Sequence, residues 1–430
     1  MTAVASGTTP VTPVQRGGMR DAVMSQAFGS LGFLAFGNGV MLLYLTKSGF
    51  SSATVLFLLA LPAIVQTFLT LPVAFRADRE GKKAWINRGG WVRMLGFLPL
   101  AAAGFFDADG ARLAIVAGIL LYAVGQAMLN GSWFALLSPI VPPSMRGAFF
   151  GRMRLTWQGA GFAFGITCTV ILGREAPLIV MQMIMAAVMM AMFVGILYLR
   201  RLPELETPTP DDRHLLVATA EVARAPGYAS FCCYAFLLTL VTFSSPNLFV
   251  LVEKDVLGFG DQQIVWMGNL LMLGSVLGFL IGGKLVDRMG AKFVFLVAHF
   301  AFGAILFTFL LRELVPVAAV AWVGALTCLF GIAQAASSIA ISTEMFALIP
   351  PTNKSLSTGV CTTLLIAGQG LSGLLVSGAL ALGLFREKWI MAGSVLSSYD
   401  AMLLISAVSV VILVVALGLV PSVMTKAREL

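Results

Sequence analysis

The stretch GGKLVDRMGAK, residues 282–292, follows a long run of uncharged residues, and a near copy, VAFRADREGKK, occupies residues 73–83 after another such run. One chain therefore carries the same charged loop twice. Each copy is short and stands between two apolar runs, which is the pattern of a polar connection between membrane-spanning helices. The repeated loop predicts a polytopic membrane protein with two similar halves.

The composition supports this prediction. Hydrophobic residues make up 59% of the 430 residues and charged residues only 11%, against roughly a quarter charged residues in soluble proteins. The net charge of +8 does not indicate a nucleic-acid partner, because the basic residues lie between the apolar runs and not along one helical face. The five cysteines lie in apolar runs and there are only two histidines, so we expect no disulfide, metal site or cofactor.

Twelve segments are long enough to cross about 30 Å of hydrocarbon as helices, which takes about 20 residues each. They are 23–46, 52–75, 91–106, 112–140, 154–173, 176–199, 229–252, 261–286, 292–311, 315–347, 355–384 and 399–422. We expect an all-α fold with five parts: a disordered cytoplasmic tail 1–19, a six-helix bundle 20–199, a cytoplasmic linker 200–228, a second six-helix bundle 229–424 and a tail 425–430. The polar N-terminal residues contain no apolar core of a cleavable signal peptide.

Lysine and arginine predict the orientation, because they are enriched in cytoplasmic loops. With both termini inside, all but seven of the 28 Lys and Arg residues fall on the cytoplasmic side; the seven are Lys47, Arg112, Arg174, Lys254, Arg312, Arg386 and Lys388. We interpret three of the inner residues, Lys82, Arg88 and Arg93, as simple headgroup anchors. The expected location is the plasma membrane, in a bacterium the inner membrane, with both termini in the cytoplasm.

The two halves match well beyond the charged loop when the chain is shifted against itself by 208–209 residues. Shared Leu or Ala counts for little between apolar runs, but polar matches in constant register are hard to obtain by chance. These matches are Gly49-Phe50 with Gly258-Phe259, Pro142-Pro143 with Pro350-Pro351, Gly151 with Gly359, Asn38 with Asn247, and Gln126-Ala127 with Gln334-Ala335. Parallel six-helix repeats with substrate bound between them are a transporter architecture.

The charged loop resembles the loop signature of the major facilitator superfamily, G-x-x-x-D-R-x-G-x-K/R. Residues 283–292 fit this signature in full, whereas the first copy has Ala74 where the family prefers Gly. The sequence VPPSMRGAFFG, residues 141–151, also looks like the family's loop between helices 4 and 5. The resemblance covers the chain after residue 20. It implies a secondary transporter that works by alternating access, functions as a monomer, and has a cavity surrounded by helices 1, 4, 7 and 10.

A cytoplasmic gate is the expected role of the repeated loops. Gly81 and Gly290 permit a tight reversal between consecutive helices, and Asp78 and Asp287 can accept hydrogen bonds from the first amides of a neighbouring helix. Contacts of this kind can form in one conformation and break in the other. The gating residues we predict are Asp78, Arg79, Gly81, Lys83, Arg146, Asp287, Arg288, Gly290, Lys292 and Glu344.

Amides inside apolar spans are the candidate substrate ligands, because an unpaired amide in lipid costs several kcal/mol. The alternative is that these amides hydrogen-bond neighbouring helices to one another. Two spans are expected to be interrupted at matching places in the two halves, one by Gly37-Asn38-Gly39 and the other by Ser244-Ser245-Pro246-Asn247. Matching interruptions of this kind indicate the substrate-binding region. The predicted substrate-binding residues are Asn38, Gln126, Asn130, Gln158, Asn247, Gln334, Ser338 and Gln369.

The spans are otherwise poor in charge. Glu344 is the only clear carboxylate that we place inside a span, and we expect no Asp, Glu, Lys or Arg in the middle of helices 1, 4, 5, 7, 8 or 11. Proton-coupled carriers commonly use a buried carboxylate, and an anionic substrate usually needs a cavity arginine. The sequence therefore predicts a neutral polar solute such as a sugar, polyol or nucleoside.

Three functions remain open at this point. The leading hypothesis is a secondary or facilitative carrier for a neutral polar small molecule, embedded in the lipid bilayer. An exporter of amphipathic compounds or lipids is the first alternative, since 21 Met and 31 Phe would allow an adaptable apolar cavity. A non-transporting assembly or sensor protein is the second. We do not expect an enzyme, because the sequence contains neither a nucleophile–base pattern nor a phosphate-binding loop.

Overall fold

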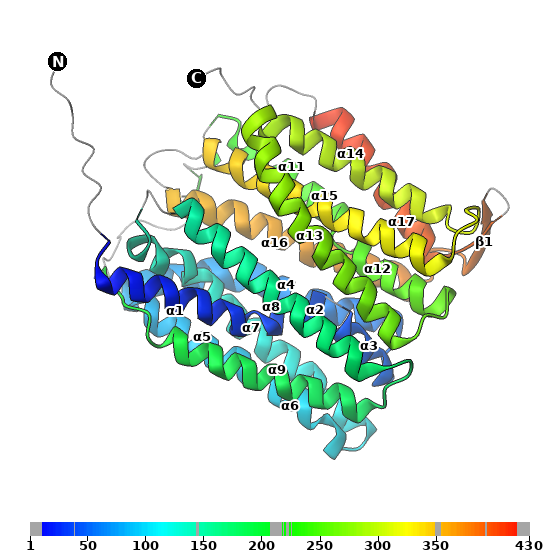
Figure 1. Cartoon of the computed structure of the whole chain (residues 1–430), viewed down its shortest axis with the longest axis horizontal. Helices are drawn as coiled ribbons and strands as arrows, with labels where there is room; N and C mark the ends of the chain where they lie inside the picture. The colour runs from blue at the N-terminus through cyan, green and yellow to red at the C-terminus, as the bar shows by residue number, and fades with distance from the viewer. Residues whose placement is uncertain are drawn as a thin grey trace.

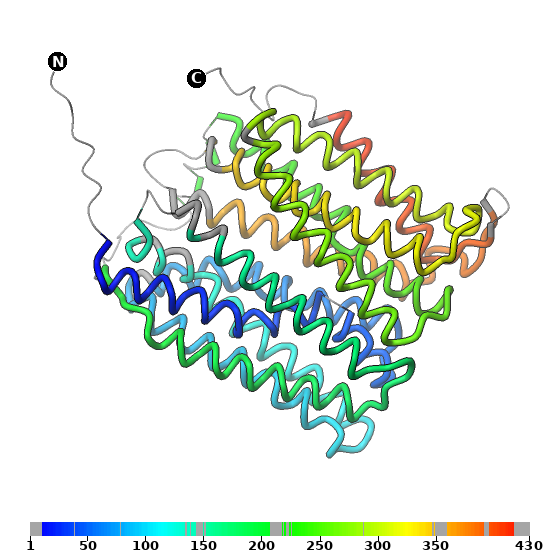
Figure 2. The backbone as a smooth tube through the Cα atoms, viewed as in Figure 1, coloured from blue at the N-terminus to red at the C-terminus, as the bar shows by residue number. Residues whose placement is uncertain are grey.

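The protein is described by a computed structural model, which covers residues 11–37, 39–142, 146–206, 217, 219–220, 223–224, 226–348, 354–391 and 394–418 (Figure 1). The expected C-terminal tail 425–430 and about half of the expected linker 200–228 lie outside these residues. The described chain forms long helices that run side by side. In Figure 2 the first half, blue to green, occupies one side of the bundle, and the second half, green to red, occupies the other.

The helices of the first half begin earlier than expected. Thr12 forms a capping box with Gln15, and Pro13 stands at the first helical position, so the helix starts there and not near residue 20. This corrects the expected disordered tail over residues 13–19. The elements are α1 Pro13–Gly29, α2 Leu31–Gly37, α3 Val40–Lys47, α4 Ser52–Glu80, α5 Lys82–Leu95, α6 Phe97–Ala102, η1 Ala103–Phe105, α7 Ala108–Ile140, α8 Arg146–Leu172 and α9 Leu178–Leu199.

The second half repeats this pattern and adds a short hairpin. Its elements are α11 Tyr228–Thr242, α12 Ser245–Leu251, the π-helical turn η3 Val252–Val256, α13 Asp261–Met289, α14 Ala291–Leu310, α15 Ala319–Leu348, α16 Lys354–Ala381, α17 Ser398–Leu413 and η4 Val414–Gly418. Between α16 and α17, β1 Lys388–Met391 pairs antiparallel with β2 Ser394–Ser397. Apart from this hairpin, the expected all-α fold is confirmed over the described residues.

The described residues contain ten or eleven candidate membrane spans, which is consistent with the expected twelve. Ten described helices are long and apolar enough to cross a membrane, and α1–α3 make an eleventh span that bends by 55°. The remaining expected span, 91–106, falls on α5 and α6, which follow one another across Gly96. The break in the first span has a backbone cause, since Gly39 has φ +83°, a left-handed conformation that favours glycine.

The two ends of the bundle differ. The turns at Gly81 and Gly290 lie at one end, which we call the basic-loop end, and the β1–β2 hairpin lies at the other, the hairpin end (Figure 1). Both turns have the predicted geometry, because Gly81 and Gly290 have φ of +104° and +83°. These are backbone angles that only glycine adopts easily.

Among the described side chains, the apolar cluster that combines both halves lies toward the hairpin end. One cluster of buried side chains there combines residues from both halves, including Leu43 and Val55 with Phe249 and Val265. At the basic-loop end, the first half has its own cluster around Trp133, and the second half has a separate cluster around Phe231 and Phe295. Over the described side chains, the halves therefore share a core at the hairpin end and have separate cores at the other, although Arg154 of α8 also lies 5.4 Å from the Phe279 ring centre of α13.

Glycines allow the close approach between the halves. α4 packs along α16, and α8 packs along α13. A Cβ added at Gly370 of α16 would lie 3.0 Å from Ile64 of α4, and one at Gly373 would collide with Ala60. Small residues at helix crossings let backbones approach in this way.

Candidate functional site

Polar contacts close the hairpin end between the halves. Asp261, the first residue of α13, accepts hydrogen bonds at Oδ2 from Lys47 Nζ at 2.9 Å and from the Ala176 amide at 3.0 Å. Its own amide donates to the Arg174 carbonyl at 2.9 Å. The start of α13 is thus tied both to α3 and to the connection between α8 and α9.

A second group of contacts lies beside the first. The Tyr399 hydroxyl of α17 donates to Asp255 Oδ2 at 2.8 Å and lies 3.1 Å from Ser52 Oγ of α4. Ser377 Oγ of α16 donates to the Ala53 carbonyl at 2.7 Å. Together these contacts form what we call the hairpin-end seal, made by Lys47, Ser52, Ala53, Ala176, Asp255, Asp261, Ser377 and Tyr399.

Beneath the seal, the breaks in the first and seventh spans border one small cavity. The cavity has a volume of about 20 Å³ and is lined by Gly37, Gly39, Pro246, Asn247, Phe249, Val250, Glu253, Met267, Gly268, Leu271 and Thr327. The seventh span breaks at Pro246, which lies in the first turn of α12. Ser372 of α16 stabilises the break by pairing with Ser244, Oγ to Oγ, at 2.9 Å. The two loosened helices predicted from the sequence do meet, although Asn38 itself lies outside the described residues.

The cavity also contains a carboxylate that we placed in an outer loop. The seventh span continues through η3 to Val256, so Glu253 lies inside it and is only 1% exposed. The expectation that Glu344 is the only clear carboxylate inside a span is therefore wrong. Neither Glu253 oxygen has a hydrogen-bond partner among the described residues. Glu253 lies in the π-helical turn, four residues after the buried Phe249, and is buried on the same side, whereas Asp255 is exposed.

Two predicted ligands belong to a chain of hydrogen bonds inside the first half. Arg93 of α5 donates to Gln126 Oε1 at 2.9 Å, Gln126 donates to Asn130 Oδ1 at 3.1 Å, and Asn130 donates to Gln66 Oε1 at 2.7 Å. The chain connects α5, α7 and α4. For Gln126 and Asn130 this is the geometry of the helix-bridging alternative. Arg93 is 6% exposed, so its interpretation as a headgroup anchor is wrong.

The remaining predicted amides have a different environment. The side chains of Gln158, Asn247, Gln334 and Gln369 make no hydrogen bond to another described residue, although Gln158 is buried and the other three are half-buried. They lie on α8, α12, α15 and α16. Gln158 is one turn from Gly161, where an added Cβ would meet Leu34 of the first half and Met272 of the second. Ser338 is half-buried on α15.

The predicted gating residues lie at the basic-loop end. Arg79 stacks its guanidinium 4.2 Å from the Phe75 ring centre, Arg288 is exposed, and Lys83 and Lys292 are half-buried. Glu344 is buried near the end of α15. The side chains of Asp78, Asp287 and Arg146 lie outside the described residues, so their gating role stays a prediction.

Sequence reasoning missed one partner of the first charged loop. Glu204, just after α9, accepts hydrogen bonds at Oε1 from the Lys82 amide at 2.7 Å and from the Lys83 amide at 3.4 Å. Lys82 Nζ is also paired with Glu206 at 3.1 Å. A carboxylate at the first amides of α5 is favourable. The acidic residues that we assigned to the linker therefore hold the first charged loop.

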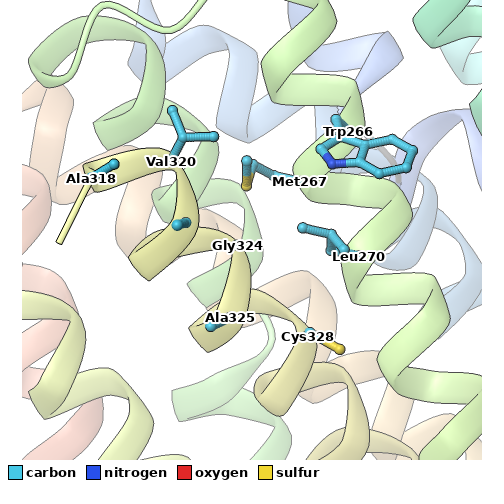
Figure 3. A pocket seen from close by; sticks show the side chains of 9 residues that line it. Trp266, Met267, Leu270, Ala318, Val320, Gly324, Ala325 and Cys328 are labelled. Atoms are coloured by element: carbon cyan, nitrogen blue, oxygen red, sulfur yellow. The ribbon is translucent and has the colours of Figure 1, made fainter.

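A larger apolar pocket lies between α13 and α15 in the second half (Figure 3). Its volume is about 360 Å³, and it is lined by Trp266, Met267, Leu270, Ala318, Val320, Ala321, Gly324, Ala325 and Cys328. Trp266 is 42% exposed. The pocket therefore opens at the surface of the bundle and offers almost no polar group to a ligand.

Comparisons with known proteins agree with the fold. Residues 24–373 match the Major Facilitator Superfamily. A nucleoside transporter, NupG, has a TM-score of 0.67 and 15% identity, covering 92% of this chain and 98% of that chain. A POT family transporter in complex with 5-aminolevulinic acid has a TM-score of 0.76 and 10% identity, covering 95% and 97%. The comparison with curated proteins finds no match. At these identities the structural matches establish the fold alone.

Proposed function

The chain belongs to the major facilitator superfamily of membrane transporters, and on this premise we propose that it carries a neutral polar small molecule by alternating access. It is an integral membrane protein. We place the basic-loop end in the cytoplasm by the positive-inside rule, with both termini inside and, in a bacterium, in the inner membrane. We propose that it acts as a monomer without cofactor or nucleic-acid partner.

One observation supports alternating access above the others. Over the described side chains, the halves share an apolar core and polar contacts at the hairpin end, whereas their clusters at the basic-loop end are separate. This is the arrangement of a carrier that is closed outside and able to part inside. Rigid-body rocking of one repeat against the other would reverse it.

The class of solute is supported by the amides. Gln158, Asn247, Gln334 and Gln369 have side chains free of hydrogen bonds to other described residues. Amides can donate to and accept from hydroxyl groups, so they suit a sugar, polyol or nucleoside. NupG, with a similar fold, is a nucleoside transporter, which is compatible with this class.

A carrier of amphipathic compounds or lipids is the second candidate. The apolar pocket of about 360 Å³ between α13 and α15 favours it, because ligand sites are usually mostly apolar and of roughly 300–1,000 Å³. Membership of a transporter family weighs against the third possibility, a protein that does not transport.

Thermal stabilisation of the purified protein separates these candidates. Sugars, polyols and nucleosides are screened beside lysolipids and organic cations, with Asn247→Ala and Gln334→Ala as test variants. Gln262→Ala is the matched control, because Gln262 is exposed at the hairpin end. A ligand at 100 times its Kd adds about 2.7 kcal/mol, or roughly 3 °C at about 2 cal/mol/K per residue.

We expect a neutral polar solute to stabilise the wild type and the Gln262→Ala control but neither Asn247→Ala nor Gln334→Ala. Stabilisation by amphiphiles alone, unchanged in both of these amide variants, would contradict the proposed substrate class and favour the lipid carrier.

A further inference from the structure

Among the described residues, Glu253 is the one charged side chain that lines the cavity. Its side chain is 1% exposed, and no described side chain or amide donates a hydrogen bond to either carboxylate oxygen. Removing an ionised carboxylate from water without a partner costs several kcal/mol. A carboxyl group held in this way is stable only when it is neutral.

The charged groups around Glu253 are engaged elsewhere. Lys47 of α3 pairs with Asp261 of α13 at 2.9 Å. Arg312, after α14, forms a bidentate ion pair with Asp400 of α17, with N–O distances of 2.6 and 2.9 Å. The other titratable groups at this end of the neighbouring elements are Lys254 and Asp255 on its own turn, Tyr399 on α17, Tyr44 on α3 and Cys328 on α15. Tyr399 donates to Asp255, and Tyr44 donates to the Leu100 carbonyl. None of the described basic groups forms an ion pair with Glu253.

The space beside Glu253 suits a proton. The cavity of about 20 Å³ has room for about one water molecule and none for a solute. Its lining has two other side chains with oxygen atoms, Asn247 and Thr327, and Thr327 Oγ1 has no partner among the described residues. A bare metal ion would need several oxygen ligands.

We propose that Glu253 is the coupling group of the carrier: its carboxylate takes up one proton from the aqueous phase at the hairpin end, and only the neutral acid allows the hairpin-end seal to close. One O–H bond forms and no other group changes. This inference rests on the proposed alternating access and adds the ion that drives it.

Glu253 is only two residues away in the chain from Asp255, which belongs to the hairpin-end seal. Asp255, two residues along the same turn, binds Tyr399, which also contacts Ser52 of α4. The Glu253 carbonyl accepts a hydrogen bond from the Phe259 amide at 2.8 Å, so the same turn also positions the start of α13. Opening the seal would move this turn and expose Glu253 to water, where the ionised form is stable.

The test measures the seal and needs no solute. Spin labels are attached at Phe105→Cys and Leu382→Cys, which lie on the two halves at the hairpin end and are 89% and 74% exposed. The background replaces Cys233 and Cys328 by alanine, because the other three cysteines are buried. Distance distributions then give the ratio of closed to open seal between pH 5 and pH 9.

For the wild type we expect the closed fraction to fall as the pH rises, with at least a tenfold change in the ratio, since each unit of difference in proton affinity between the two conformations changes the ratio about tenfold. Glu253→Gln, which resembles the neutral acid, should remain closed at every pH. The control Asp109→Asn removes an exposed carboxylate at the same end and should keep the wild-type response. Asp255→Asn should loosen the seal at every pH and retain the pH dependence.

Three results would overturn the inference. They are a wild-type ratio that does not change with pH, a pH response that persists in Glu253→Gln, and closure at constant pH on replacing choline by sodium, which would assign a metal ion to the site. Each leaves alternating access intact, because uptake by a protein cross-linked across the seal tests that separately.

Discussion

The Lys47–Asp261 pair offers a quantitative test of the hairpin-end seal. The two side chains are 23% and 8% exposed and lie 2.9 Å apart, and the same Asp261 oxygen accepts from the Ala176 amide at 3.0 Å. Fully exposed ion pairs contribute only about 0.2–1 kcal/mol, whereas hydrogen bonds to charged groups contribute about 1.5–3 kcal/mol. Because this pair is little exposed, we expect the larger range for Asp261→Ala.

A loss of about 1.5–3 kcal/mol shifts the closed-to-open ratio by roughly 10–150-fold. If the wild type is closed about 99 times in 100, the open form would rise to roughly 10–60%. Asp261→Asn should have a smaller effect, because its amide oxygen can still accept from the Ala176 amide. The assay is the distance between labels at Phe105→Cys and Leu382→Cys.

Lys47→Met supplies the control for this reasoning. The double variant with Asp261→Ala should open the seal less than the sum of the single effects, with a coupling above about 0.5 kcal/mol. A closed-to-open ratio within twofold of the wild type in both Asp261 variants would refute the assignment of this pair to the seal.

Three further substitutions test other parts of the structure. Asp400→Asn leaves Arg312 buried without its charged partner and should lower the free energy of unfolding by about 3–5 kcal/mol, measured as a lower Tm; an unchanged Tm would contradict the buried pair. Gly373→Val places side-chain atoms against Ala60 where α4 and α16 meet, and it should shift the label distances toward the open seal. Glu204→Ala removes the acceptor for two amides at the start of α5 and should cost about 0.5–2 kcal/mol; the exposed Glu206→Ala is its control.

Local chemistry explains why much of the fold could be predicted from the sequence. Spans follow from unbroken apolar runs, and the reversals at Gly81 and Gly290 follow from a backbone angle that only glycine adopts easily. The first helix starts earlier than expected because the capping box at Thr12 outweighs the polar composition of the segment.

The position of Glu253 inside a span could not be predicted from local sequence. VEKDV reads as a polar loop because it has three consecutive charges, but in the structure the span continues through these residues as a π-helical turn in which Glu253 is buried. Such a turn depends on the packing of neighbouring helices. The apolar residues on both sides, Val252 and Val256, were the available signal that the span continues.

The predicted cavity amides show a second limit. Gln126 and Gln334 occupy matching positions in the repeat, yet Gln126 is bonded to Arg93 and Gln334 has no partner among the described side chains. A repeat specifies equivalent positions, but the partner of each amide depends on residues that the other half does not share. Arg93 is such a residue, because it lies in only one half.

A reversible cross-link across the seal tests alternating access most directly. A disulfide between Ala53→Cys and Ser377→Cys would join α4 to α16. In the wild type, the Ser377 hydroxyl donates to the Ala53 carbonyl at 2.7 Å at this position. Uptake of the stabilising solute is measured in proteoliposomes before and after reduction. We predict that the oxidised protein does not transport and that reduction restores uptake, whereas full uptake by the cross-linked protein would contradict the account.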